Sequence, residues 1–222
     1  MKKSIFLAAL VLISAGCFAQ KANVSKARSL ADAETPDYAG ARAAIAEALQ
    51  NDETKDQPNT WYVAGFIGYK EFYNGNMKQQ LGQQFDKKAW GDAVYESLNY
   101  WTKAYDMAKI PTIDKKGREK FDTRTPKSIV PKVVEYFNSI PLIIAGFDAY
   151  QAGDPSKAYD MFIAHCNIPE SDMMKENPSE MAKIVCDSNY YIYLYQSGQL
   201  AEAAERYDEA LAAFERMNTE HA

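Results

Sequence analysis

The stretch "SGQLAEAAERYDEAL", residues 197–211, decides the fold class. From Ala203 onward, small and apolar residues recur four, seven and eight positions later, at Tyr207, Ala210 and Leu211. These intervals place one stripe on one face of an α-helix, while the acidic residues point elsewhere. Gly198 precedes the stripe, where a chain that leaves one helix needs a turn residue tolerant of positive φ. The spacing therefore predicts a turn at Gly198 and an amphipathic helix after it.

The same spacing recurs in three segments upstream. The segments are "AGDPSKAYDMFIAHC", "TPDYAGARAAIAEAL" and "VYESLNYWTKAYDMA". The residues that match are Gly153, Ala158, Phe162, His165 and Cys166, then Pro36, Ala41, Ile45, Ala48 and Leu49, and finally Ser97, Trp101, Ala104 and Tyr105. Recurrence at fixed offsets predicts that the chain is built from a repeated helical unit.

A further candidate helix precedes two of these segments. "TWYVAGFIGYKEFY" carries Ala64 and Gly65, and "IPLIIAGFDAYQAG" carries Ala145 and Gly146 at the same relative positions. The combination resembles the tetratricopeptide repeat (TPR), a helix–turn–helix unit of about 34 residues with the pattern W-x₂-L-G-x₂-Y, A-x₃-F and P. Pro169 falls close to the expected closing proline. The resemblance implies an all-α fold whose helix–turn–helix repeats stack into a right-handed TPR-like α-solenoid.

The repeat pattern gives expected boundaries for the helices and the units. The helices are expected over 21–34, 37–51, 59–73, 84–108, 129–151, 156–166, 178–197 and 200–216. They form units over 21–51, 59–110, 129–168 and 178–216, within a repeat domain over 20–222. A polar link over 109–127 separates the second and third units, and an insertion with an Asn74-Gly75 turn signal divides the second.

Pro141 interrupts the expected helix over 129–151. A proline inside a helix removes a hydrogen bond and clashes with the preceding turn, whereas the first turn tolerates it. We therefore expect Pro141 to begin a repeat helix, with Asn138 or Ser139 as the N-cap, and residues 129–138 to form a short helix of their own.

The first nineteen residues are expected to be a signal peptide. Two lysines, an apolar run and small residues precede Gln20, and the run is shorter than the roughly twenty residues that span a bilayer. Cleavage after Ala19 gives an exported protein without a lipid anchor, which is the favoured alternative. Cleavage before Cys17 gives a lipoprotein instead. Either alternative places the protein in the periplasm or at the outer membrane of a Gram-negative bacterium, because the chain resembles exported TPR proteins, and no later stretch is apolar enough to be a membrane span.

Composition and motifs argue against several classes of function. The chain carries 30 acidic and 25 basic residues, a net charge of −5, which disfavours nucleic acid as a partner. Its histidines are His165 and His221, and neither stands at metal-ligand spacing with another His, Cys or acid. No phosphate-binding glycine loop, dinucleotide fingerprint or nucleophile motif occurs in the sequence. The sequence therefore predicts a non-enzymatic protein without a metal or cofactor.

The resemblance implies a binding surface for a protein or peptide. In TPR proteins the first helix of each unit lines the concave surface that contacts the partner. The corresponding positions here are Tyr62, Phe66, Tyr69, Lys70, Ile143, Phe147, Tyr150, Gln151, Ile192, Tyr195 and Gln196. Tyrosine recurs in one column, and it combines apolar area with a polar tip, as binding surfaces favour. The alternative is that these aromatic residues fill a narrow groove.

The sequence leaves three further alternatives, which concern the lipid anchor, the two cysteines and the basic link. The envelope alternative is a structural lipoprotein of an outer-membrane assembly or uptake complex, anchored through Cys17, and the oligomeric state is not determined by sequence. Cys166 and Cys186 either form a disulfide, if Cys186 lies two turns into the first helix of the fourth unit, or remain packed thiols. The basic link over 109–127 is expected to contact an acidic partner or to fold back on the acidic C-terminal unit.

Overall fold

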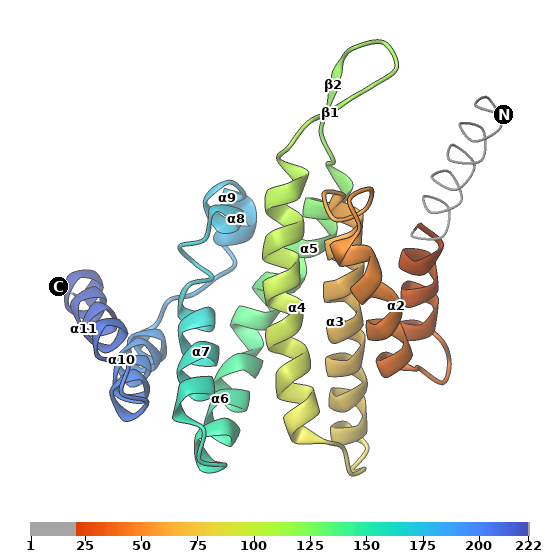
Figure 1. Ribbon diagram of the computed structural model, residues 1–222. Coiled ribbons are helices and arrows are strands. Elements are labelled where there is room, and N and C mark those ends of the chain that lie inside the picture. Colours follow the sequence, from red (N-terminus) through yellow and green to blue (C-terminus); the bar gives the residue numbers. More distant parts are fainter. Residues whose placement is uncertain (1–20, 222) are drawn as a thin grey trace, which may run out of the picture. The chain divides into compact units, whose positions relative to one another are not determined.

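The computed structural model describes residues 21–221 as mostly helical (Figure 1). The predicted signal peptide over 1–19 and Cys17 lie outside the described residues. A helix over 21–31 is followed by α2 (Tyr38–Gln50), α3 (Pro58–Gln80), α4 (Lys87–Ala108), β1 (Thr112–Ile113), β2 (Glu119–Lys120), α5 (Arg124–Ser139), α6 (Pro141–Gln151), α7 (Pro155–Cys166), α8 (Asp172–Lys175), α9 (Pro178–Met181), α10 (Ser188–Ala203) and α11 (Tyr207–His221). The predicted all-α class is confirmed for the described residues, with one small hairpin added.

No single helix among the described residues is long and apolar enough to cross a membrane. Helices α5 and α6 reach that length and apolar composition only when they are taken together, and the pair is bent by 54° at its junction.

The chain forms two compact units that do not follow the order of the sequence. Among the described residues, the first unit contains 21–71 and a second segment, Asn99–Pro126, whereas the second unit contains Phe72–Leu98 and 127–221. Helices α3 and α4 therefore each contribute one part to the first unit and another part to the second.

The first unit is centred on a close approach of α3 and α4. A Cβ added at Gly65 would lie 2.4 Å from Cδ1 of Trp101, so only glycine leaves room for the indole ring. Trp101 is completely buried, and its Nε1 donates a hydrogen bond of 3.3 Å to the Tyr62 carbonyl oxygen. Small buried residues on α2 and on the helix over 21–31 complete this core, including Ala27, Ala31, Ala41 and Ala48.

In the second unit, a glycine on one helix also lies against an aromatic ring on the next helix, at two places. Gly146 on α6 lies against Phe162 on α7, and Gly198 on α10 lies against Phe214 on α11. In both pairs the aromatic residue follows the glycine by sixteen positions. Helix α7 also packs against α10, so α6, α7, α10 and α11 pack in sequence order. The predicted stripe of Ala158, Phe162, His165 and Cys166 is buried in this core, as the repeat pattern requires.

The structure corrects the opening prediction for residues 197–211. Gly198 lies inside α10, which continues to Ala203, and the turn comes at Ala204, Glu205 and Arg206, where Glu205 has a φ of 59°. Tyr207 and Leu211 are exposed, and the buried residues of α11 are Ala210 and Ala213. The prediction was wrong by seven residues because Gly198 is needed for its missing side chain and not for its backbone freedom.

Two other regions differ from expectation. Asn74 and Gly75 lie within α3, because Gly75 makes room for Trp90, and the chain turns at Gly82 with a φ of 66°. The single helix expected over 178–197 is replaced by α9 and α10, with Cys186 before α10. Asp187 caps α10 by accepting hydrogen bonds from the backbone amides of Asn189 and Tyr190, which fixes its start.

The expected link over 109–127 is shorter than predicted. Asp122 accepts hydrogen bonds from the backbone amides of Arg124 and Thr125, so α5 begins at Arg124. Pro141 begins α6 as expected, and α5 is the predicted separate helix, although it reaches back to Arg124. Neither Asn138 nor Ser139 caps α6, because Ile140 occupies that position with a φ of 48° and no side-chain cap.

Candidate functional site

Helix α6 carries a row of exposed apolar side chains in the second unit. Ile144, Phe147 and Tyr150 are 47%, 41% and 52% exposed, and they follow one another at intervals of three residues. Single exposed apolar residues are ordinary, whereas a continuous group marks a contact surface. Hollows lie on both sides of α6.

The first hollow lies between α6 and α10 and has a volume of about 230 Å³. We call it the α6–α10 hollow, and its lining residues are Phe147, Tyr150, Phe162, Gln196, Gln199 and Leu200. Phe162 forms the wall, with its ring edge-on to Phe147 at a centroid distance of 5.0 Å. The structure thus brings together three residues that the sequence assigned to partner binding, namely Phe147, Tyr150 and Gln196.

Gln196, which lines the α6–α10 hollow, has a polar atom without a hydrogen-bond partner among the described residues. Its side-chain oxygen Oε1 is buried and has no hydrogen-bond partner within residues 21–221. A buried oxygen without a donor costs about 1–3 kcal/mol. A ligand that supplies an N–H or O–H group at this point would remove that cost.

The other predicted residues of α6 and α10 lie outside this hollow. Tyr195 and Ile192 are 43% and 49% exposed, and the ring of Tyr195 packs on Phe214 at 5.5 Å. Gln151 is exposed at the end of α6, whereas Ile143 is buried in the core.

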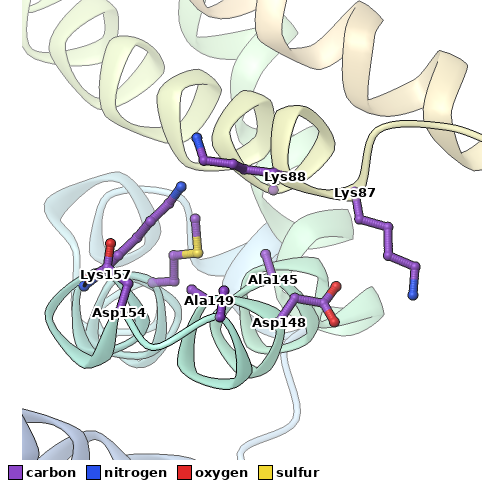
Figure 2. A pocket seen from close by; sticks show the side chains of 10 residues that line it. Lys87, Lys88, Ala145, Asp148, Ala149, Asp154 and Lys157 are labelled. Carbon is purple, nitrogen blue, oxygen red and sulfur yellow. Dashed lines mark hydrogen bonds between the residues drawn. The ribbon is translucent and has the colours of Figure 1, made fainter.

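A longer hollow lies on the opposite side of α6, toward the end of α3 and the start of α4. Two adjoining volumes of about 280 and 320 Å³ make it up, and both are lined by Lys87 and Asp148. We call the pair the α4–α6 groove; Figure 2 shows its larger part. Its smaller part is lined by aromatic residues, namely Phe72, Phe85 and Trp90.

Small residues keep the larger part of the groove open. A Cβ at Gly91 would lie 2.8 Å from the Cβ of Ala145, so α4 and α6 approach closely at that point. Ala145, Ala149 and Ala152 line the hollow, and Met161 lines it from α7. Sequence reasoning missed this groove because residues 71–90 were expected to be an insertion, although the alanine spacing on α6 was a usable signal.

Some charged side chains along the groove form ion pairs, and others do not. Lys88 and Lys157 both pair with Asp92, the former at 3.0 Å. Burial raises the pKa of Asp92, but hydrogen bonds from Lys157 and Lys88 outweigh that effect and hold it below its ordinary value. The side chains of Lys87 and Asp148 have no ion-pair or hydrogen-bond partner in the described part of the chain, and Figure 2 shows both directed toward one edge of the hollow.

The predicted site residues of the first unit are mainly engaged in packing. Phe66 is 8% exposed, and Tyr69 packs on Trp101 at a centroid distance of 5.4 Å. Tyr62 stacks on Phe66 at 6.2 Å, with the Arg28 guanidinium over both rings. Lys70 forms an ion pair of 2.7 Å with Asp32. These four residues resemble the groove-filling alternative more closely than an open surface.

The basic link forms an exposed hairpin that extends beyond the end of α4 (Figure 1). Ile113 and Phe121 are 65% and 50% exposed, and Arg118 is paired with Asp114 at 2.8 Å.

Cys166 and Cys186 are not joined by a disulfide in this structure. Cys166 is buried at the end of α7, and Cys186 is partly buried before α10. The oxidised pairing stays a prediction for the protein in an oxidising compartment.

Within residues 21–221 no group of three or more His, Cys, Asp or Glu side chains is placed to hold a metal ion.

No protein-family model matches this chain, and neither the curated proteins nor the solved structures contain a match.

Proposed function

We propose that this protein is a non-enzymatic repeat module that binds a peptide or protein segment along α6. The observation that carries the proposal is the α6–α10 hollow. There Phe147, Tyr150 and Gln196, each assigned to partner contact from the sequence, line one cavity of about 230 Å³.

The glycine–aromatic pairs support a tetratricopeptide-like architecture for this module. Gly146 and Phe162 share their spacing with Gly198 and Phe214. Gly65 and Trp101 show the same contact at a spacing twenty residues longer, which matches the insertion in the second repeat. The proposed arrangement of the repeats is a right-handed α-solenoid.

The α6–α10 hollow is suited to an apolar side chain next to a backbone amide. The rings of Phe147 and Tyr150 offer apolar area, whose burial contributes about 25 cal/mol per Å². Gln196 Oε1 accepts the hydrogen bond that a peptide N–H can donate. An extended peptide presents both groups within neighbouring residues, whereas a purely apolar ligand would leave the oxygen unsatisfied.

The α4–α6 groove adds charge selection on the other side of α6. Lys87 attracts an acidic group and Asp148 a basic one, and neither has to abandon an existing partner among the described residues. We expect the bound segment to carry both signs of charge around its apolar anchors.

A peptide-display selection against the purified protein tests this function. Peptides enriched on the wild-type protein are expected to lose binding to Phe147→Ala/Tyr150→Ala, because two of the three rings that line the hollow are gone. Each truncation removes roughly 1–2 kcal/mol of binding free energy if the ring is an anchor. Fluorescence anisotropy of a labelled enriched peptide gives the dissociation constants.

The matched control is Tyr207→Ala/Leu211→Ala, which removes two exposed apolar side chains from α11. This control is expected to bind as the wild type does. Equal loss in both double variants, or no loss in either, would remove α6 as the binding surface.

Export to the periplasm or cell envelope is part of the proposal. The mass of the mature N-terminus distinguishes the two alternatives: Gln20 as the first residue supports the protein without an anchor, and a diacylated Cys17 supports the structural lipoprotein. An intact Met1 would contradict both.

A further inference from the structure

A further pocket, distinct from the surface around α6, is open to solvent and has the buried His165 in its lining. It has a volume of about 310 Å³ and lies where α5, α7 and the start of α10 meet. This size is at the lower end of the range for small-molecule sites, about 300–1,000 Å³. We call it the His165 cavity, and its polar lining residues are Asn138, His165, Asp187, Asn189, Tyr190 and Tyr193.

His165 is held rigidly by its aromatic neighbours. Its ring stacks on Phe137 at a centroid distance of 4.6 Å and an interplanar angle of 6°. Tyr193 meets the same ring edge-on at 5.8 Å. The imidazole is 1% exposed, and its Nδ1 has no hydrogen-bond partner in the described part of the chain. Packing therefore fixes the orientation of a ring that lines the pocket and has one nitrogen left unsatisfied.

Two other polar groups of the cavity also lack a hydrogen-bond partner among the described residues. The Asn138 amide donates through Nδ2 to the Lys183 carbonyl at 3.2 Å, which leaves its side-chain oxygen without a partner among the described residues. The Tyr193 hydroxyl likewise makes no hydrogen bond within residues 21–221. By contrast, Tyr190 is engaged, because its hydroxyl donates to Cys166 and accepts from Arg216.

The backbone at the cavity is strained at Ile140. This residue has a φ of 48°, which is an outlier for a β-branched side chain, and it lines the cavity. Such strain concentrates at ligand-binding sites, where the surrounding structure maintains it.

The charge balance of the cavity indicates a neutral ligand. Burial lowers the pKa of His165 to about 4, so its imidazole is uncharged at neutral pH. The Asp187 carboxylate already accepts hydrogen bonds from the backbone amides of Asn189 and Tyr190 and from the Asn189 side chain. An anionic ligand would therefore be repelled by the Asp187 carboxylate, whose oxygen atoms already accept hydrogen bonds from neutral N–H groups, and the neutral imidazole attracts no charged group.

We propose that the His165 cavity binds a neutral, hydroxylated small molecule of monosaccharide size, held by the His165 imidazole, the Asn138 side-chain oxygen and the Tyr193 hydroxyl. A hydroxyl group both donates and accepts, so it satisfies either tautomer of the imidazole and the amide oxygen together. The carbon face of such a ligand packs on the apolar lining, which includes Phe137, Ile140 and Val185.

The test uses the two histidines of the chain as reporters. Long-range ¹H–¹⁵N spectra at neutral pH resolve the ring nitrogens of His165 and of His221, and His221 serves as the internal control. The probes are D-glucose, D-galactose, D-mannose and N-acetyl-D-glucosamine, added up to about 10 mM to detect dissociation constants on the order of 1 mM. A saturable shift of the His165 Nδ1 signal with at least one probe, and none for His221, is the expected result.

Variants and charged analogues complete the test. Asn138→Ala is expected to weaken binding about fivefold to tenfold through the loss of one hydrogen bond, and the exposed position keeps the fold intact. Asn218→Ala, at an exposed position on α11, is the matched control and is expected to change nothing. No saturable shift with any probe overturns the proposal, as does equal binding by Asn138→Ala. Tighter binding of D-glucosamine or D-glucuronate than of D-glucose overturns the inference that the ligand is neutral.

Discussion

Gly146 lies directly against the ring of Phe162, so that a methyl group added to the glycine would lie 2.6 Å from Cδ2 of the ring. Phe162 is completely buried and cannot retreat into solvent. The contact sets how closely α6 and α7 approach, and through α6 it positions Phe147 and Tyr150 at the edge of the α6–α10 hollow.

Gly146→Ala is expected to lower the free energy of unfolding by about 1–3 kcal/mol, because overpacking outweighs the helix propensity gained by alanine. Urea denaturation measures the change. The double variant Gly146→Ala/Phe162→Leu is expected to lose less than the sum of the single variants, since leucine relieves the clash. Strict additivity would mean that the two residues do not determine each other's packing.

Glu205→Gly is expected to stabilise the protein by about 0.5–1 kcal/mol. Glu205 has a φ of 59° after the end of α10, a conformation that costs a residue with a side chain but not glycine. Glu202→Gly is the matched control within the helix, and there the same change is expected to destabilise. Thermal denaturation compares the two, and a lower melting temperature for Glu205→Gly would contradict the turn at Glu205.

Protonation of His165 makes the protein less stable in mild acid. The pKa falls from 6.5 to about 4 on burial, so the unfolded chain binds a proton that the folded chain does not. Stability is therefore complete above pH 6.5 and decreases as the pH falls toward 4, by up to about 3 kcal/mol. His165→Phe is expected to flatten this dependence in urea titrations at several pH values, and an unchanged slope would show that other groups cause it.

The two thiols are expected to differ in reactivity. Cys186 is partly buried and reacts with iodoacetamide in the folded protein, whereas Cys166 is completely buried and reacts only after unfolding. Intact-mass spectrometry counts the adducts without reductant. A chain that accepts none under denaturing conditions contains the disulfide that the sequence allowed, and the thiol form described here would then be the reduced state.

The features that the sequence predicted well depend on local physics. Pro141 begins α6 because the missing amide of proline is harmless in a first turn, whatever surrounds it. The buried residues Ala158, Phe162 and Cys166 follow helical spacing, which is also a local property.

The glycines show why other predictions failed. Gly75 and Gly198 were expected in turns, yet each is buried in a helix beside an aromatic ring, Trp90 or Phe214. Sequence spacing alone does not tell whether a glycine serves backbone freedom or close packing, since the partner ring can lie far along the chain. The α4–α6 groove was missed for the same reason: Lys87 and Asp148 are brought together by tertiary packing and by no motif.

The path of the chain between the two units determines the order in which their cores can be completed during synthesis. Gly65 leaves room for Trp101 in the first unit, but the ribosome makes Phe72–Leu98 of the second unit before it reaches Trp101. The early helices therefore emerge with the space beside Gly65 unfilled. The core of the first unit stays incomplete until the segment Asn99–Pro126, which contains the second part of α4, has been synthesised. A stalled or truncated chain that ends before Trp101 would lack the indole that completes the first core, and we expect chaperones and proteases to recognise it.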